Sequence, residues 1–354
     1  MLHCASTMAI ERTRKAETPV QAKPITGETE ALEQTLRPRT LTEYIGQRKI
    51  KEHLLVHLAA ARKREEPLGH TLLHGPPGLG KTTLAHIMAV EMGAQIRITS
   101  GPAIEKPGDL AALLTNLQDG DVLFIDEIHR LRPVIEEVLY GAMEDFVLDI
   151  VIGKGPTARS VRLNLKPFTL VGATTKAGAV SAPLRDRFMH SFKLSFYEPD
   201  EMRKIVGRSA SILGLSMEEG AGTRVAGCSR STPRIANRLV RAVRDFSQVK
   251  SEDRVTVACV EETLRALDID HEGLDATDRL LLSTIVQSFA GGPVGLSTLA
   301  AMLAEEEETI EDVYEPFLLQ QGYLHRTPKG RMATKKAFER LGSVLPEAVQ
   351  PALL

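Results

Sequence analysis

The 354-residue chain contains no tryptophan, and aromatic residues make up only 4% of it. Proteins that bind single-stranded nucleic acid stack the bases on aromatic side chains, so this composition disfavours that class. Cysteine is scarce as well, because Cys4, Cys228 and Cys259 lie far apart and form no Cys-x-x-Cys pair. Neither a disulfide framework nor a zinc site is predicted. A reducing, cytoplasmic environment fits this cysteine usage best.

Long apolar segments and a strong net charge are also missing. No apolar run approaches the ~20 residues that cross a bilayer, and the charged residues between Arg12 and Glu17 interrupt any signal-peptide core. The net charge of −2 argues against a surface uniformly coated in positive charge. A protein can still hold nucleic acid through one local basic patch, so this class stays open.

The length predicts two or three domains, because one hydrophobic core rarely serves so long a chain. Residues 1–35 are polar and lack apolar periodicity, which predicts a disordered tail. The further division expected is a first domain at 36–197, a small helical domain at 198–268 and a third domain at 269–354.

The first domain alternates helical and strand patterns. A helical face is expected around Lys49–Lys63, and short apolar strands at Thr71–His74, Val122–Ile125 and Phe168–Gly172. Strands that alternate with helices predict a parallel sheet covered on both faces, the α/β class.

The remaining chain changes pattern twice. Residues 200–268 show helical periodicity only, including a helix over Pro233–Phe246 with Thr232 as its N-cap. Residues 277–354 predict three short helices followed by a hairpin around the turn Thr327–Gly330. Three helices and a hairpin form the winged-helix plan.

A phosphate-binding loop follows the first strand. Gly75–Thr83 reads GPPGLGKTT and contains the G-x-x-x-x-G-K-[ST] pattern. Glycines such as Gly78 and Gly80 let backbone N–H groups point inward at phosphates, and the following helix begins with Lys81, Thr82 and Thr83. Lys81 is expected on the β- and γ-phosphates of ATP, and the Thr82 hydroxyl on Mg²⁺.

Two acids follow the second strand. Val122–Ile125 leads directly into Asp126 and Glu127. In a parallel sheet this places Asp126 beside the Mg²⁺ shell and Glu127 where it can polarise the attacking water. An acid pair alone could be a solvated turn, but together with the Lys81 loop it predicts ATP hydrolysis.

The chain resembles the RuvB family of AAA+ motors. GPPGLGKTT, LFIDEIHRL, GATTKAG, APLRDRF and TPRIANRLVRAVRDF occur in that family's order and spacing, over roughly 36–341. The resemblance implies an α/β P-loop AAA+ domain, a small all-α lid and a C-terminal winged-helix domain. It also implies a homohexameric ring that uses ATP and Mg²⁺ to pull duplex DNA, driving branch migration of Holliday junctions in recombination and repair.

The resemblance further assigns roles to individual residues. Thr175 matches the sensor-1 position, Arg187 the arginine finger that enters the neighbouring subunit's site, and Arg234 the sensor-2 position of the lid. Arg185 is a second candidate finger. Further nucleotide-contacting positions match Leu36, Arg37, Glu144, Asp145, Phe146 and Tyr197. Plainer interpretations stay open: surface charges for the arginines, a strand-end hydrogen bond for Thr175, and hinge packing for Tyr197.

A hairpin is expected at Phe146–Ser160, with Gly153–Pro156 as its turn. By the resemblance it contacts the partner protein RuvA, and the same assembly includes the resolvase RuvC. A plain surface hairpin is the alternative.

The segment Gly322–Lys336 carries five basic residues and no acid. Such a basic wing suits contact with backbone phosphates, which carry no sequence information. Arg326 and Arg331 match the family's DNA-contacting positions, whereas the alternative is a solvated turn. Six acids within 305–312 offset these basic residues, so the patch does not appear in the net charge of the chain.

Three other functions compete with a DNA motor. A clamp-loader-type ATPase would end in a different C-terminal domain. A protein unfoldase would need an aromatic pore residue, and none occurs between Arg97 and Val122. A winged-helix regulator without activity would need neither Glu127 nor an arginine finger.

Overall fold

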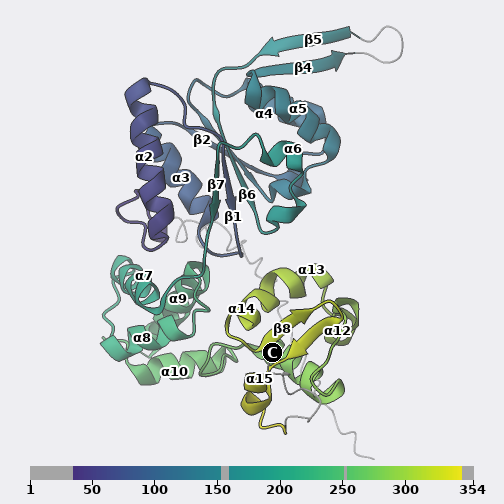
Figure 1. Ribbon diagram of the computed structural model, residues 1–354. Coiled ribbons are helices and arrows are strands. Elements are labelled where there is room, and N and C mark those ends of the chain that lie inside the picture. The colour runs from purple at the N-terminus through teal and green to yellow at the C-terminus, as the bar shows by residue number, and fades with distance from the viewer. Residues whose placement is uncertain (1–34, 153–158, 251–252, 345–354) are drawn as a thin grey trace, which may run out of the picture. The chain divides into compact units, whose positions relative to one another are not determined.

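The computed structural model describes residues 35–152, 159–250 and 253–344 (Figure 1). The predicted N-terminal tail, except for Thr35, and the predicted turn Gly153–Pro156 lie outside the described residues. Among the residues described, no helix is long and apolar enough to cross a membrane.

A five-stranded parallel sheet forms the centre of the first domain, in the order β2-β3-β6-β1-β7. Its strands are β1 (Thr71–His74), β2 (Ile96–Ser100), β3 (Val122–Asp126), β6 (Thr169–Thr174) and β7 (His190–Lys193). The sequence predicted β1, β3 and β6 but neither edge strand. Both edges are largely exposed, and Phe192 is the one buried side chain of β7, so they lack the apolar run that marks a central strand.

Alternating side chains of the strands fill two separate cores, one on each face of the sheet. Leu73 and Phe124 point to the face covered by α2 (Arg48–Arg64) and α3 (Lys81–Met92). Leu72 and Leu123 point to the opposite face, covered by α4 (Pro107–Thr115) and α5 (Pro133–Glu144) (Figure 1). The carboxyl ends of β1, β3 and β6 therefore meet at one edge between the two helical layers.

Strands β4 (Val147–Ile152) and β5 (Arg159–Asn164) form a separate antiparallel hairpin where one was predicted, and it continues to Asn164. Asp149 and Arg162 lie directly opposite each other and form an exposed ion pair at 2.9 Å. The burial of Leu148 fixes the root of the hairpin against the α4–α5 core.

The second domain is all-helical, as expected. It consists of α7 (Pro199–Ile212), α8 (Glu219–Gly227), α9 (Pro233–Val249) and α10 (Val257–Ala266). One face of α9 is buried through Leu239 and Val243. Pro233 opens this helix and Thr232 is its N-cap residue, but the Thr232 hydroxyl bonds the Ser229 carbonyl (3.2 Å) and not an N–H of the helix.

The third domain has the predicted helices and hairpin around its own core. Its elements are α11 (Ala276–Ser283), a π-helical turn (Thr284–Ser288), α12 (Leu296–Leu303), α13 (Glu307–Thr309), a second π-helical turn (Ile310–Tyr314), α14 (Glu315–Gln320), β8 (Leu324–Thr327), β9 (Gly330–Ala333) and α15 (Lys335–Arg340). Val294 pairs with Arg331 as a third extended segment beside the hairpin.

Candidate functional site

The Gly-rich loop joins β1 to α3, and its three glycines have positive φ angles that other residues rarely adopt. Gly80 caps α3 at φ 94°, a left-handed conformation that side chains resist. A Cβ on Gly75 would lie 2.5 Å from the Leu194 carbonyl oxygen. The loop therefore presses directly on the segment after β7, and the N-terminus of α3 opens towards the loop, as anion binding requires.

Lys81 is the first residue of α3 and is 7% exposed. Its ammonium donates hydrogen bonds to the carbonyls of Gly75 (2.7 Å) and Pro76 (3.0 Å). Burial lowers the pKa of Lys81, while the carboxylates of Glu127 and Asp126 act in the opposite direction. A buried cation held by neutral carbonyls attracts an anion such as a phosphate.

Asp126 ends β3, and the neighbouring strand β6, which leads into Thr175, separates it from β1 and the loop. Burial is the main cause that raises its pKa, and the adjacent Glu127 charge adds to the effect. A divalent cation beside this carboxylate would relieve that cost. Within the described ranges, no cluster of three or more His, Cys, Asp or Glu gathers as a metal-binding set. Mg²⁺ typically takes one or two protein oxygens plus phosphates and water, so the Asp126 carboxylate is the kind of ligand that it uses.

Glu127 has a left-handed backbone, with φ 47°. Its Oε2 lies 3.4 Å from both the backbone N–H and the hydroxyl of Thr175, and 3.2 Å from Nδ1 of His129. Burial alone would raise the pKa of Glu127, but His129, the Thr175 N–H and Lys81 together lower it. The carboxylate stays ionised at neutral pH and is oriented by groups from the segments that follow β3 and β6.

His129 is a residue that the sequence interpretation missed. Its Nδ1 also lies 2.9 Å from the hydroxyl of the buried Thr174, so the ring bridges β6 and Glu127. The only signal in the sequence was a histidine two residues after an acid pair. The fold is needed to show that its side chain points towards Glu127.

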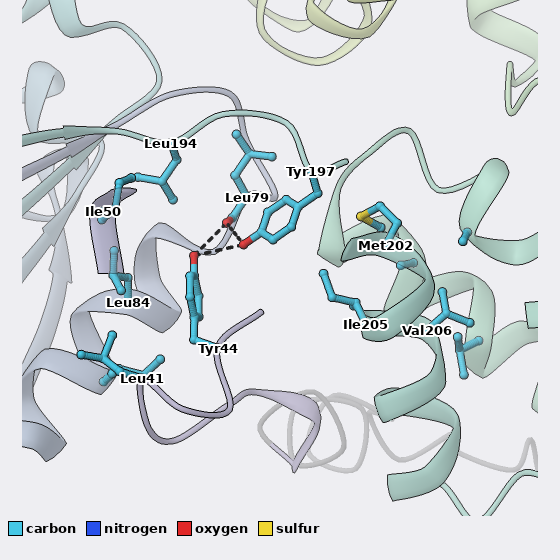
Figure 2. Close-up of a cluster of buried hydrophobic side chains, with 14 of the residues drawn as sticks. Leu41, Tyr44, Ile50, Leu79, Leu84, Leu194, Tyr197, Met202, Ile205 and Val206 are labelled. Atoms are coloured by element: carbon cyan, nitrogen blue, oxygen red, sulfur yellow. Dashed lines mark hydrogen bonds between the residues drawn. The ribbon is translucent and has the colours of Figure 1, made fainter. Parts of the chain in front are cut away.

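The hydroxyls of Tyr44 and Tyr197 meet at the loop (Figure 2). The Tyr197 hydroxyl lies 3.1 Å from the Tyr44 hydroxyl and 3.1 Å from the Leu79 carbonyl oxygen. Burial raises the pKa of Tyr197 to about 12, so it remains a neutral donor. A Cβ on Gly46 would lie 2.6 Å from the Tyr197 ring, which shows how closely the segment before the lid is packed. Tyr44 was also missed by the sequence interpretation.

The lid reaches the same loop through Arg234. Its backbone N–H approaches the Gly78 carbonyl (3.4 Å) at the first turn of α9, and its side chain is exposed. The structure thus brings the loop, Asp126, Glu127, Thr175, Tyr197 and Arg234 to one place. Thr82 and Thr83 lie half-buried in the first turn of α3.

Arg187 lies in a different environment. It binds the Pro183 carbonyl (2.7 Å) and Glu144 (3.1 Å), and it lies over the Tyr140 ring at 4.3 Å. The other positions singled out from the sequence are distributed as follows: Arg185 and Asp145 are exposed, Phe146 packs edge-on against Phe168, Leu36 is buried and Arg37 is half-buried. Arg187 and Glu144 form one surface pair, and Lys81 belongs to another cluster of contacts.

In the third domain, Arg326 and Arg331 face each other across the β8–β9 hairpin. Both bind the carboxylate of Glu315, a residue that the sequence did not single out. The Arg326 side chain is 45% exposed and that of Arg331 only 14%. Lys329 lies exposed at the tip of the turn.

The loop with its buried lysine, the two acids at the end of β3 and the helical lid that touches the loop define a P-loop ATPase of the AAA+ class. Family models match nearly all of the described chain: the Holliday junction DNA helicase RuvB P-loop domain at residues 36–194, the RuvB AAA lid domain at 197–270 and the RuvB C-terminal winged helix domain at 271–342. The chain belongs to the RuvB family.

Individual relatives agree along almost the whole length. A protein of Chloroflexus aurantiacus named Holliday junction branch migration complex subunit RuvB is 59% identical over 321 residues, 91% of this chain and 92% of that protein. The solved structure of the Thermotoga maritima RuvB Holliday junction branch migration motor has 49% identity and a TM-score of 0.81, covering 88% of this chain and 100% of its own. A substituted form of that protein gives a TM-score of 0.83 at 50% identity, with 88% and 99% covered.

Proposed function

We propose that this chain is the ATP-driven motor of Holliday junction branch migration in recombination and DNA repair. Six copies would form a ring that pulls duplex arms, converting ATP and water to ADP and phosphate. The observation that supports this most is one continuous chain holding both a hydrolytic centre, where Thr175 contacts Glu127 at 3.4 Å, and a winged-helix hairpin with the exposed Arg326.

The residues at the P-loop divide the work of hydrolysis. Lys81 exchanges its carbonyl partners for the β- and γ-phosphates, and Thr82 and Asp126 would hold Mg²⁺. The metal supplies charge neutralisation on the phosphoryl group. Glu127, kept ionised by His129 and Thr175, orients and polarises the attacking water.

The surface pair of Arg187 and Glu144 supports action between subunits. Arg187 is held on its own subunit by Pro183 and Glu144, away from the contacts of Lys81. It is suited to project into a neighbour's site and stabilise the charge that develops on the phosphates. On this proposal the ring is part of the active site, and Glu144, Asp145 and Phe146 lie at the same boundary.

The relatives' names describe a branch migration complex, so further proteins belong to the proposal. The β4–β5 hairpin is the expected contact for RuvA, within Phe146–Ser160, because it stands apart from the sheet and bears an exposed ion pair, Asp149–Arg162. RuvC would join the same assembly on the junction. The proposed location is the cytoplasm.

A four-way DNA junction with labelled arms tests the function. The purified chain with RuvA, ATP and Mg²⁺ should convert the junction into two duplexes, and the Glu127→Gln variant should bind the junction without converting it. Conversion by the Glu127→Gln variant at the wild-type rate would contradict the proposal, and so would a lack of conversion by the wild-type chain with RuvA.

A further inference from the structure

One buried carboxylate joins the two arginines of the DNA hairpin. Arg326 on β8 and Arg331 on β9 are direct partners in the strand register. Glu315 lies between their side chains: its Oε2 is 2.8 Å from Nε of Arg326, and its Oε1 is 2.6 Å from Nε of Arg331. A single side chain therefore fixes both guanidinium groups.

The fold holds Glu315 firmly in this position. It is the first residue of α14, directly after the π-helical turn Ile310–Tyr314, and its side chain is 1% exposed. Tyr323 and Leu318 of the domain core pack near the same helix and hairpin. An ionised carboxylate at such depth is retained only when strong partners surround it, and two arginines supply them.

The two arginines are not equivalent. The backbone of Arg331 is bonded in both directions to Val294 (2.8 and 2.9 Å), and its side chain is 14% exposed. Arg326 is 45% exposed, and within the described parts of the chain no protein acceptor binds its Nη1. A guanidinium has five N–H donors, so Arg326 keeps an outward edge while Glu315 occupies the inner one.

This arrangement sets two effects against each other. By charge alone, a carboxylate beside the hairpin repels DNA phosphates. By geometry, it removes the rotational freedom of Arg326 before DNA arrives, so that less entropy is lost when a phosphate binds. Burial decides between them, because Glu315 is covered and Arg326 stands between it and solvent.

We propose that Glu315 is a positioning residue for DNA binding: it aims the free edge of Arg326 at a backbone phosphate, with Arg331 as the second anchor of the clamp. The inference rests on the proposed function, because it assumes that this hairpin contacts duplex DNA. Glu311 is a peripheral member of the same group, 3.3 Å from Arg326 and half-exposed.

The sign of one substitution tests the proposal. In the full-length chain, Glu315→Gln removes a negative charge, so simple electrostatics predicts tighter DNA binding. Loss of positioning predicts binding weaker by about tenfold, with the slope of log K against log salt shallower by roughly 0.9 for one lost phosphate contact. Fluorescence anisotropy on two unrelated duplexes measures both quantities. Unchanged or tighter binding would overturn the proposal.

Glu339→Gln is the matched control. It removes the same charge from the same domain, but Glu339 lies in an exposed pair with Lys335, 64% and 74% exposed. Its DNA affinity should equal or slightly exceed that of the wild type. Glu315→Asp keeps the charge one methylene shorter, and it should recover part of the affinity that Glu315→Gln loses. Equal losses in Glu315→Asp and Glu315→Gln would count against positioning of the guanidinium.

A double variant separates positioning from a general loss of structure. Adding Glu315→Gln to Arg326→Ala should cost no further DNA affinity, because the group being aimed is gone. An additive loss would show that Glu315 acts on the domain as a whole and would reject the inference. If Arg326→Ala alone leaves DNA binding unchanged, the hairpin itself is not the DNA contact, and the proposed function of this domain fails instead.

The DNA-dependent ATPase gives a second readout. Glu315→Gln should raise the DNA concentration that gives half-maximal stimulation by about tenfold and leave the maximal rate near that of the wild type. A fall in the maximal rate with unchanged half-saturation would contradict a role in binding.

Discussion

The P-loop and the winged-helix hairpin both contain basic side chains, but they hold these side chains differently. Lys81 is buried and bonded to the neutral carbonyls of Gly75 and Pro76. Arg326 and Arg331 are bonded to a full negative charge on Glu315. The first site holds its cation on neutral carbonyl oxygens, with Glu127 and Asp126 acting on it electrostatically, whereas the second holds two arginines directly on one carboxylate.

The difference predicts two kinds of binding. An anion at the P-loop replaces neutral partners and relieves the buried charge of Lys81, so nucleotide binding should be tight and depend little on salt. A DNA phosphate at the hairpin meets the remaining edge of an arginine that already has a counterion. Binding there should be weaker and strongly dependent on salt, which suits a motor that must release its track at every step.

The largest effect is expected at the P-loop. Lys81→Ala should lower nucleotide affinity on the order of 100-fold, because a charged hydrogen-bond donor is lost from a buried site. Glu127→Gln should keep nucleotide binding and reduce hydrolysis by roughly 10³- to 10⁴-fold, since the proposed role of Glu127 is to act on the water. Titration with a fluorescent nucleotide and a phosphate-release assay measure the two effects. Equal losses of affinity in both variants would break the division of roles.

The next effect tests whether Arg187 acts outside its own subunit. Arg187→Ala should reduce hydrolysis by about 10³-fold if it acts as an arginine finger. Mixing Arg187→Ala with Glu127→Gln subunits should restore part of the activity, because some interfaces then combine an intact Glu127 with an intact Arg187. Mixtures that never exceed the sum of the two separate variants would show that Arg187 acts only within its own chain.

A smaller effect should divide the two hairpin arginines. Arg326→Ala should weaken duplex binding by about tenfold for any sequence, because phosphates carry no base identity. Arg331→Ala should chiefly lower the melting temperature, by a few degrees, because it leaves the buried Glu315 with one partner fewer. Anisotropy and thermal unfolding on the same preparations distinguish the two. If the two variants change DNA affinity and melting temperature equally, Arg326 as the DNA contact and Arg331 as the anchor of Glu315 cannot be distinguished.

The smallest effect involves Asp278, a buried carboxylate that is only partly compensated by hydrogen bonds and by the nearby Arg230. Burial raises the pKa of Asp278 to about 7 despite the nearby Arg230, and the adjacent Asp275 adds to the increase. Its Oδ1 has no hydrogen-bond partner among the described residues.

A folded pKa above the unfolded value means that this group's stabilising contribution is present at low pH and is lost as pH rises through about 7. Wild-type melting temperature should therefore fall by a few degrees between pH 6 and 8.5, and Asp278→Asn should reduce that fall. A pH dependence that is the same in the variant would assign it to other groups.

The sequence predicted the central strands, the phosphate loop and the three-part domain plan because these depend on local pattern. Leu72 and Leu73 predict a buried strand because both side chains are apolar. Lys81 is recognised by its fixed spacing from the glycines of the loop. Edge strands β2 and β7 were missed because partial exposure removes the apolar signal.

The missed site residues depend on tertiary contact. His129, Tyr44 and Glu315 acquire their partners from segments distant in the chain, such as Tyr197, 153 positions from Tyr44. For Glu315, the preceding run of acids entered the sequence interpretation only through the net charge, and only the fold shows that this carboxylate is buried against two arginines.

Two glycines give the chain a mechanical property. Gly75 lies against the backbone of Leu194, and Gly46 lies against the ring of Tyr197, both too close to admit even a methyl group. The segment that leads from the sheet to the lid is thus tightly packed at both of these contacts. At Gly75 the phosphate loop meets the backbone of Leu194 directly, so a shift of the loop would have to displace the start of that segment. An alanine at either position would force the neighbouring segment to shift while leaving the phosphate-binding groups chemically intact.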